Sequence, residues 1–425
     1  MHAGKQQKFV KWKLMNIIEE KQAVWQKEEE QRPGCLFLLP RALFPVVSGY
    51  SNKNIHLLPF LAQHYRLHLI LLTDKPLLEE EQLFYRKAGI RLTVCRFSKA
   101  DHIKGALWAL LCGKPLQVGY YYSRKMQKYV DEQQEPQRMI AGLVRTAEYL
   151  LRYRIKAQKD AEQKARFFDM VDSIGCAYER SAKTTKSMFW KLIYHFEAKH
   201  LLNYEQTSVA AFRNTFFVNR EEEKKFRSFG KTACLHHGVK DELFDYSKKD
   251  GRYCGYAAFL GKMNYQPNID AVQWYLENVQ AQLGEKIPLL VIGAYPTPEL
   301  KRIAGQYPGT ELTGYCDDPY IYLNSAMAVI APMRSGGGIQ NKVLEAMALG
   351  KLVILSRLAA EAIAEARDGE HFLVAETAEE YRDILLDIRE KPEKYSQIGA
   401  QAKALIRNYY TWEHYCTEYL QALQD

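Results

Sequence analysis

Residues 326–355 read AMAVIAPMRSGGGIQNKVLEAMALGKLVIL, and this stretch decides the fold class. An apolar run at 326–332 is followed by a glycine loop, a segment of good helix formers and a second apolar run at 351–355. The pattern predicts a strand, a loop, a helix and a second strand. Since strands joined through a helix are typical of parallel sheets, the stretch indicates an α/β domain.

The same texture of short apolar runs separated by helical segments extends along most of the chain. In the first half the runs are CLFLLP (35–40), HLILLT (68–73), RLTVCRF (91–97), RMIAGLV (138–144), RFFDMVD (166–172) and NTFFVN (214–219). In the second half they are YAAFLG (256–261), PLLVIG (288–293), TELTGY (310–315), AMAVIAP (326–332), KLVILS (351–356) and HFLVA (371–375). The polar stretch KDELFDYSKKDGR (240–252) separates the two sets and is the expected linker. We therefore expect two α/β domains, at 35–239 and 253–404.

Both ends of the chain differ from this pattern of alternating apolar runs and helical segments. Residues 1–34 are rich in Lys and Glu, with apolar residues near a helical period, and are expected to form an amphipathic helix. Residues 379–425 lack a strand signal and are expected to form closing helices, of which the last, about 405–425, can pack back on the first domain.

The composition is that of an ordinary globular protein. The 425 residues are 47% hydrophobic and 26% charged, with a net charge of +9, which argues against a disordered or low-complexity chain. No run approaches the roughly 20 apolar residues of a membrane-spanning helix, and the N-terminus lacks a secretory pattern, so we expect a cytoplasmic protein. The eight cysteines are scattered without metal-ligand spacing and are expected to be reduced thiols.

The glycine loop is the first candidate site. Ser335 and the three glycines 336–338 leave free amide groups before a helix, where the positive end of the helix dipole favours an anion. Lys342 and Glu345 lie on adjacent turns, so that one can meet a phosphate while the other accepts hydrogen bonds from sugar hydroxyls. An ordinary tight turn followed by a surface Lys–Glu pair is the alternative.

Several segments resemble one enzyme family. GGGIQNKVLEAMALGK (336–351) is similar to the nucleotide-sugar signature of the retaining glycosyltransferases of family four. FLGKMNYQPNIDAVQWY (259–275) resembles their phosphate loop, and LTGYCDDPYIYL (312–323) resembles their base-recognition loop. FFDMVDSIGCAYER (167–180) is like a segment of the sugar transferases of bacterial exopolysaccharide and capsule assembly. The resemblance implies two Rossmann-like domains facing a cleft (the GT-B fold), a UDP- or GDP-sugar donor, a glycan or lipid-linked acceptor, and retention of configuration.

The resemblance also assigns roles in the second domain. Glu345 matches the second glutamate of the family's paired-glutamate motif, which holds the ribose. The first glutamate would fall at Gly337, so the backbone amides of Gly336, Gly337 and Gly338 are expected to take over its contact with the donor sugar. Lys262 stands where the family has an arginine facing the diphosphate, and Lys342 is the expected substitute for a lysine missing nearby. The implied substrate-binding set is completed by Gly336, Gly338, Ile339, Gln340, Asn341 and Tyr315.

In the first domain, Gly49 lies in a segment, 48–52, that matches the family's glycine loop beneath the donor phosphates. Arg145, Asp172 and Ser173 end two strands and are expected at the ligand-binding edge of the sheet, the first two as catalytic residues. Pairing of Arg145 with Asp172 as a mere brace is the alternative. The adjacent histidines at 236–237 are expected to form a turn near the hinge rather than a metal or base site.

The sequence has no Asp-x-Asp triad, so we expect no metal and no cofactor, with Lys342, Lys262 and amide dipoles meeting the charge of the departing diphosphate. No nucleophilic carboxylate stands out. One other function remains open, a glycosyltransferase-like binding protein without turnover, suggested by Gly337. Nucleic-acid binding is suggested only by the basic pI and the aromatic content, and we expect no nucleic-acid partner because the basic residues are dispersed over both domains without a recognised motif. Residues 5–18 combine four lysines with apolar side chains and can lie on an anionic membrane, or pack on the chain's own core.

Overall fold

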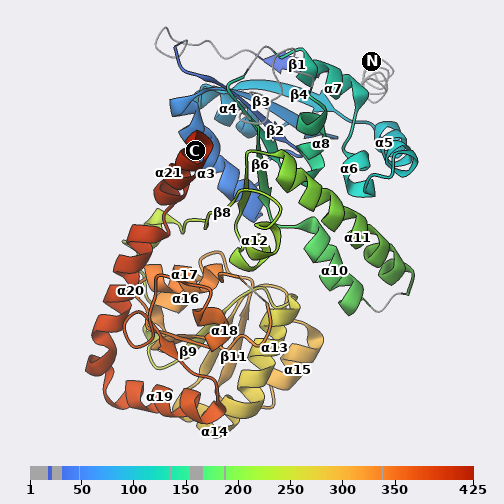
Figure 1. Ribbon diagram of the computed structural model, residues 1–425. Coiled ribbons are helices and arrows are strands. Elements are labelled where there is room, and N and C mark those ends of the chain that lie inside the picture. The colour runs from blue at the N-terminus through green and yellow to red at the C-terminus, as the bar shows by residue number, and fades with distance from the viewer. Residues whose placement is uncertain are drawn as a thin grey trace, which may run out of the picture. The chain divides into compact units, whose positions relative to one another are not determined.

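The computed structural model describes residues 18–21, 31–46, 48–133, 136–153, 166–185, 188–336 and 338–425 (Figure 1). The chain divides into two compact units. Unit 1 runs to Leu235 and also contains Cys416–Asp425, and unit 2 comprises His236–Tyr415. Each unit is an α/β sandwich around one sheet, which confirms the predicted fold class.

Unit 1 contains an eight-stranded sheet in the order β1-β4-β3-β2-β5-β6-β7-β8, parallel except for β1. Its strands are β1 (Ile18–Lys21), β2 (Gly34–Leu39), β3 (Arg66–Thr73), β4 (Arg91–Arg96), β5 (Arg138–Gly142), β6 (Arg166–Val171), β7 (Asn214–Phe217) and β8 (Thr232–Cys234). The central strands are buried along nearly their whole length, as expected for a parallel sheet covered on both faces.

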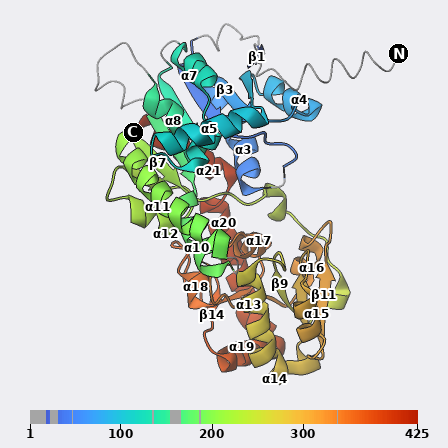
Figure 2. The same ribbon diagram turned by 90° about the vertical axis from the view of Figure 1, so that its right-hand side faces the viewer.

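The helices of unit 1 cover both faces of this sheet (Figures 1 and 2). They are α3 (Gly49–His64), α4 (Glu79–Lys87), α5 (Lys99–Leu111), α6 (Leu116–Tyr120), α7 (Arg124–Asp131), α8 (Val144–Arg152), α10 (Ile174–Thr184), α11 (Met188–Ala211) and α12 (Arg220–Phe226). Helix α5 begins with a capping box in which Ser98 and Asp101 satisfy each other's backbone amides.

The helix expected over residues 1–34 is wrong at Ile18–Lys21. These residues form β1, which pairs antiparallel with β4. A parallel sheet leaves unpaired amide and carbonyl groups along its last strand, and pairing satisfies them better than a helical turn does. The prediction is also wrong at residues 31–34, which are not helical, because β2 begins at Gly34. Its remaining residues, 1–17 and 22–30, include most of the segment proposed to meet a membrane and lie outside the described residues.

Unit 2 contains a six-stranded parallel sheet in the order β11-β10-β9-β12-β13-β14. The strands are β9 (Ala257–Leu260), β10 (Leu289–Ile292), β11 (Thr310–Gly314), β12 (Ala328–Ala331), β13 (Val353–Leu355) and β14 (Leu373–Val374). The helices are α13 (Gln266–Tyr275), α14 (Ala281–Leu283), α15 (Pro298–Ala304), α16 (Tyr320–Ser325), α17 (Asn341–Ala348), α18 (Arg357–Ala360), α19 (Ala378–Glu390) and α20 (Ser396–Tyr409). The final helix, α21 (Trp412–Gln424), begins in unit 2 and belongs to unit 1 from Cys416 on. A π-helical turn, η3 (Leu276–Gln280), joins α13 to α14.

The stretch expected to be a linker, 240–252, is packed into unit 2. It forms two short 3₁₀ turns, η1 (Asp241–Leu243) and η2 (Gly251–Tyr253), and Leu243 and Phe244 are buried in the core of that unit. Burial of these two apolar side chains outweighs the polar composition around them.

The final helix carries the chain back into unit 1. In that unit the ring of Tyr419 packs on Phe216 at 4.7 Å, and Arg138 Nε donates to the Leu423 carbonyl at 2.7 Å. No helix in the described ranges is both long and apolar enough to cross a membrane.

Candidate functional site

Lys342 is the central charge at the carboxyl edge of the unit 2 sheet. It lies in the first turn of α17, partly buried, and its Nζ donates to Asn268 Oδ1 at 2.6 Å. The ammonium also lies 4.2 Å from the centre of the Phe259 ring and 3.4 Å from Met333 Sδ. Burial lowers the pKa of Lys342 to about 7, and no described carboxylate forms an ion pair with it. A cation surrounded by neutral partners is suited to receive an anion.

Asn268 holds this lysine against the loop that follows β9. Its Oδ1 accepts from Lys342, and its Nδ2 donates to the Lys262 carbonyl at 3.0 Å. A Cβ atom at Gly261 would lie 2.5 Å from the amide of Asn268, so any other residue there would displace that amide. The loop and the first turn of α17 are therefore fixed together through one amide.

The glycine loop, residues 336–338, lies close to the beginning of α13. Gly336 and Gly338 both have positive φ, +90° and +84°, which explains glycine at each position. A Cβ at Gly336 would lie 3.2 Å from Pro267. Gly337, where the resembled family has a glutamate, lies outside the described residues.

Glu345 lies one turn after Lys342 in a crowded polar pocket. Its carboxylate accepts a hydrogen bond from Tyr320, whose ring lies 5.3 Å from Lys240 Nζ. Burial raises the pKa of Glu345 to about 7, while Lys240 and Tyr320 oppose that rise. The pKa of Tyr320 is raised by its own burial and by the negative charge of Glu345.

The remaining predicted residues of unit 2 lie around these two groups. Gln340 is the residue before α17, and its Nε2 donates weakly to the carbonyls of Gly336 and Gly338 at 3.4 and 3.5 Å. Asn341 is exposed at the first position of the helix, and Ile339 packs against the core. The side chains of Lys262 and Tyr315 are exposed, and Tyr315 hydrogen-bonds Asp317.

In unit 1, Arg145 and Asp172 do not form the pair weighed as an alternative. Arg145 Nε donates to Gln117 Oε1 at 3.2 Å, and its guanidinium lies 4.9 Å from the centre of the Tyr121 ring. Asp172 follows β6, and its side chain is exposed. Its pKa is raised because the surrounding protein partly removes the hydration of the carboxylate and because the negative charge of Glu222 lies nearby.

Ser173 is a buried helix cap. Its Oγ accepts from the Cys176 amide at 2.9 Å and donates to Glu205 Oε2 at 2.5 Å, while its own amide donates to Glu222. The hydroxyl is completely buried, so its predicted role in substrate binding has no support in this geometry. Burial raises the pKa of Glu205 to about 7.

Gly49 is the first residue of α3, and a Cβ there would meet nothing within 4 Å, so the position is open to a ligand. One turn further on, Lys53 forms an ion pair with Asp169 on β6, and both side chains are buried. This pair fixes α3 to β6, the strand that Asp172 follows.

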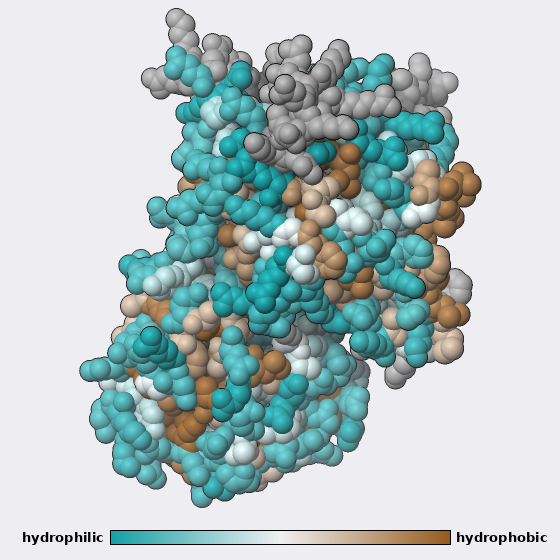
Figure 3. All heavy atoms as spheres, viewed as in Figure 1, coloured by the Kyte–Doolittle hydropathy of each residue, from teal (hydrophilic) through white to brown (hydrophobic). Residues whose placement is uncertain are grey.

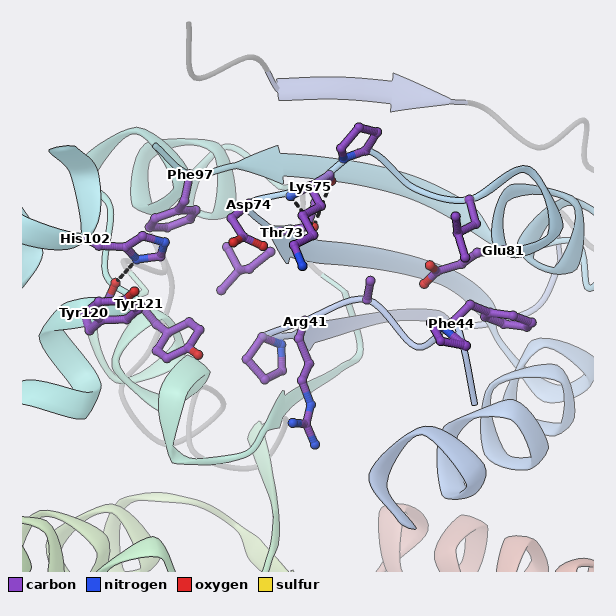
Figure 4. Close-up of a pocket in the computed structure, with 16 residues that line it drawn as sticks. Arg41, Phe44, Thr73, Asp74, Lys75, Glu81, Phe97, His102, Tyr120 and Tyr121 are labelled. Atoms are coloured by element: carbon purple, nitrogen blue, oxygen red, sulfur yellow. Dashed lines mark hydrogen bonds between the residues drawn. The ribbon is translucent and has the colours of Figure 1, made fainter. Parts of the chain in front are cut away.

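A cavity of about 420 Å³ opens at the carboxyl ends of β2, β3 and β4 (Figure 4). Arg41, Asp74 and Lys75 bring charge to it, and Glu81 lies buried in its wall. On the other side His102 stacks on Tyr120 with ring centres 4.0 Å apart, and its Nδ1 is 2.7 Å from the carbonyl of Tyr120. Tyr121, which Arg145 contacts, also lines the cavity.

Strained backbone occurs at the same sheet edges. The described non-glycine residues with positive φ are Leu143, Val171 and Tyr295, which end or follow β5, β6 and β10. Such conformations cost of order 1–3 kcal/mol each and gather at functional sites.

The adjacent histidines pack on aromatic rings of unit 2. The ring centre of His236 lies 6.0 Å from that of Tyr410, and the ring centre of His237 lies 5.5 Å from that of Trp412.

Sequence reasoning missed the groups that position the site. Asn268 and Tyr320 lie inside segments quoted for their resemblance, but nothing in the spacing indicated which charged residue each would contact. Lys240 was assigned to a linker. The cavity of unit 1 was missed because its lining follows three different strands.

Comparisons with known proteins agree with this architecture. Residues 255–390 match the family model described as glycosyl transferases group 1. No curated protein sequence matches the chain.

Several solved structures share the fold of this chain along nearly their whole length. Anabaena HepE in complex with UDP is 13% identical, with a TM-score of 0.61, covering 92% of this chain and 99% of that one. Sucrose-phosphate synthase from Thermosynechococcus elongatus is 14% identical, with a TM-score of 0.60 and coverage of 92% and 98%. A glycosyltransferase from Rickettsia africae is 12% identical, with a TM-score of 0.56 and coverage of 92% and 98%. These likenesses show the GT-B fold, and the match to the group 1 family model falls within its second half, at residues 255–390.

Proposed function

We propose that this protein transfers a sugar from a nucleoside diphosphate sugar, UDP- or GDP-linked, to a glycan or lipid-linked acceptor with retention of configuration. One observation carries the proposal: Lys342, a partly buried ammonium without a carboxylate partner, lies beside the glycine loop and one turn before Glu345. The match of residues 255–390 to a glycosyltransferase family supports it.

In this proposal the donor lies along the carboxyl edge of the unit 2 sheet. The diphosphate meets Lys342 and the first amides of α17, and the ribose hydroxyls donate to Glu345. As the glycosidic bond breaks, negative charge grows on the departing diphosphate. Lys342 then stabilises the transition state more than the bound donor.

We assign the acceptor to the cavity of unit 1 (Figure 4). Stacking between Phe97 and Tyr120 occupies the ring of His102, so the exposed ring of Tyr120 is the one that suits the face of a sugar. Arg41, Asp74 and Lys75 can hydrogen-bond the hydroxyl groups of the sugar. Arg145 adjoins the same cavity through Tyr121. A role in bacterial surface polysaccharide assembly follows the resemblance and is part of the proposal.

Glu345→Gln is expected to weaken binding of UDP or GDP by about 1.5–3 kcal/mol at pH 8, the range for a hydrogen bond to a charged group. The wild-type affinity should also fall relative to that of the variant as the pH drops from 8 to 5.5, because Glu345, with a pKa of about 7, becomes protonated and loses its acceptor charge. Protonation of Lys342, whose pKa is also about 7, strengthens diphosphate binding in both proteins alike, so the difference in affinity between them isolates Glu345. Titration calorimetry with each nucleotide measures both effects.

The control is Glu299→Gln on α15, an exposed carboxylate outside the site. Equal affinity of Glu345→Gln and the parent would reject the ribose assignment. If the protein binds the nucleotide but transfers sugar to no acceptor tested, the result would favour the alternative function, a glycosyltransferase-like protein that binds its ligand without catalysing transfer.

Chelation is expected to leave transfer intact, because the proposal assigns the diphosphate charge to Lys342 and amide dipoles. Initial rates with EDTA, compared with rates after adding Mg²⁺ or Mn²⁺, measure this. Loss of activity that either ion restores would overturn metal independence.

A further inference from the structure

Helix α5 of unit 1 presents an apolar face to solvent. Four of its side chains, each more than half exposed, are Ile103, Leu107, Leu110 and Leu111. Their spacing of i, i+4, i+7 and i+8 places them in one stripe of the helix. A surface helix normally turns such a stripe toward the core, so this one indicates an interaction surface.

Helix α11 adds a second group of exposed apolar side chains. Met188, Leu192 and Phe196 follow one another at intervals of four residues and are each more than half exposed, and Trp190 is about half exposed. Together with the stripe of α5 these residues are called the docking face below.

The two parts of the docking face lie on the same side of unit 1. Figure 2 shows α5 and α11 both turned toward the viewer, and in Figure 3 hydrophobic side chains gather along the right-hand edge over α5 and the beginning of α11. Helix α6 connects them, because the amide of Gln117 donates to Glu197 of α11 at 2.9 Å and α6 packs on α5.

Lysines border the apolar side chains of the docking face. Lys99 and Lys104 are exposed on α5, and Lys191 and Lys199 are exposed on α11. A groove of about 880 Å³ between α10 and α11 is bordered by Lys183, Lys191 and Lys199 over an apolar floor that includes Ala198 and Leu202.

Three carboxylates lie near the docking face, and two of them are engaged elsewhere. Asp101 caps α5 through Ser98, and Glu197 is buried against Gln117. Glu179 lies 3.9 Å from Lys183 in the same groove and offsets the charge of that lysine, which leaves the charges of Lys99, Lys104, Lys191 and Lys199. The face therefore combines exposed apolar and aromatic side chains with an excess of positive charge.

We propose that the docking face binds an anionic phospholipid membrane. Helix α5 lies in the membrane interface with its leucines among the acyl chains, Trp190 and Phe196 lie at headgroup depth, and the lysines contact lipid phosphates. This combination of features favours a lipid surface over a protein partner, whose contact surface is typically depleted in lysine. The proposal rests on unit 1 alone and is independent of the proposed transferase activity.

The test is co-sedimentation of the full chain with vesicles of phosphatidylglycerol and phosphatidylcholine, compared with phosphatidylcholine alone. The parent protein should bind the anionic vesicles preferentially and lose binding as salt rises. Leu107→Glu combined with Leu111→Glu should weaken binding roughly tenfold or more, because it places charge in the inserted face. Lys104→Glu combined with Lys191→Glu should weaken binding to the anionic vesicles by a similar factor.

Leu83→Glu, an exposed leucine on α4, is the matched control and should bind as the parent does. All substituted side chains are exposed, so melting temperatures should stay close to that of the parent. The proposal is overturned if the parent ignores anionic vesicles, or if both double variants bind as the parent does. A parent that self-associates, does not bind vesicles and becomes monomeric on the leucine substitutions would make the face a protein interface instead.

Discussion

Replacing Lys342 by methionine is expected to lower kcat by about 10²- to 10³-fold, the loss typical of removing one preorganised group that stabilises transition-state charge. The apparent KM for the donor should change much less, because the charge that Lys342 meets grows as the bond breaks. Steady-state kinetics with the nucleotide sugar give both values.

The same variant should fold at least as well as the parent. The pKa of Lys342 falls from 10.5 in the reference state to about 7 in the folded chain, so the folded state disfavours the charged form. The parent's stability is therefore reduced at neutral pH and rises between about pH 7 and 10.5, a dependence that methionine abolishes. If the Lys342→Met variant has the same Tm as the parent or a higher one and yet has lost turnover, Lys342 is a residue that lowers stability in order to serve the reaction.

Lys301→Met, an exposed lysine on α15, is the control and should retain full activity. Lys262→Met should have a smaller effect than Lys342→Met, because its exposed ammonium is screened by solvent. If Lys342→Met raises the KM for the donor and leaves kcat unchanged, Lys342 serves only to bind the donor in the ground state.

Lys53→Met is expected to destabilise unit 1 by about 3–5 kcal/mol, the cost of leaving a buried carboxylate without its partner. Asp169 is nearly completely buried, and Lys53 is its ion-pair partner across the interior. Urea denaturation, followed by circular dichroism, measures the loss.

Lys128→Met removes an exposed lysine that lies 3.9 Å from Glu132 and should cost less than about 0.5 kcal/mol. Adding Asp169→Leu to Lys53→Met should recover part of the lost stability, since no charge is then buried. Equal stability of Lys53→Met and Lys128→Met would show that water reaches Asp169.

The strands of both sheets could be predicted from the sequence because a buried parallel strand is a short, nearly continuous apolar run, as at residues 35–40 and 288–293. Strand β8 (Thr232–Cys234) has no such run and was missed. The antiparallel pairing of β1 with β4 was also missed, because it depends on an open sheet edge that no local sequence pattern indicates.

The charged groups of the site could be named from the glycine loop and the helix after it, but their environments could not. Whether Lys342 meets a carboxylate or an amide depends on Asn268, 74 residues earlier in the chain. The position of Ser173 at a strand end predicted an open edge, whereas Glu205 and Glu222, from later helices, enclose it. Such contacts depend on tertiary packing and leave no periodic signal.

The return of residues 416–425 to unit 1 has a consequence for synthesis on the ribosome. Unit 2 is complete once Tyr415 has emerged, but the first-made unit still lacks Tyr419 and Leu423, which pack on Phe216 and accept from Arg138. Since domains generally fold as they emerge, the order of completion is here reversed: the unit translated first must wait for the last ten residues. A nascent chain that lacked residues 416–425 would thus carry its defect in the unit that was made first.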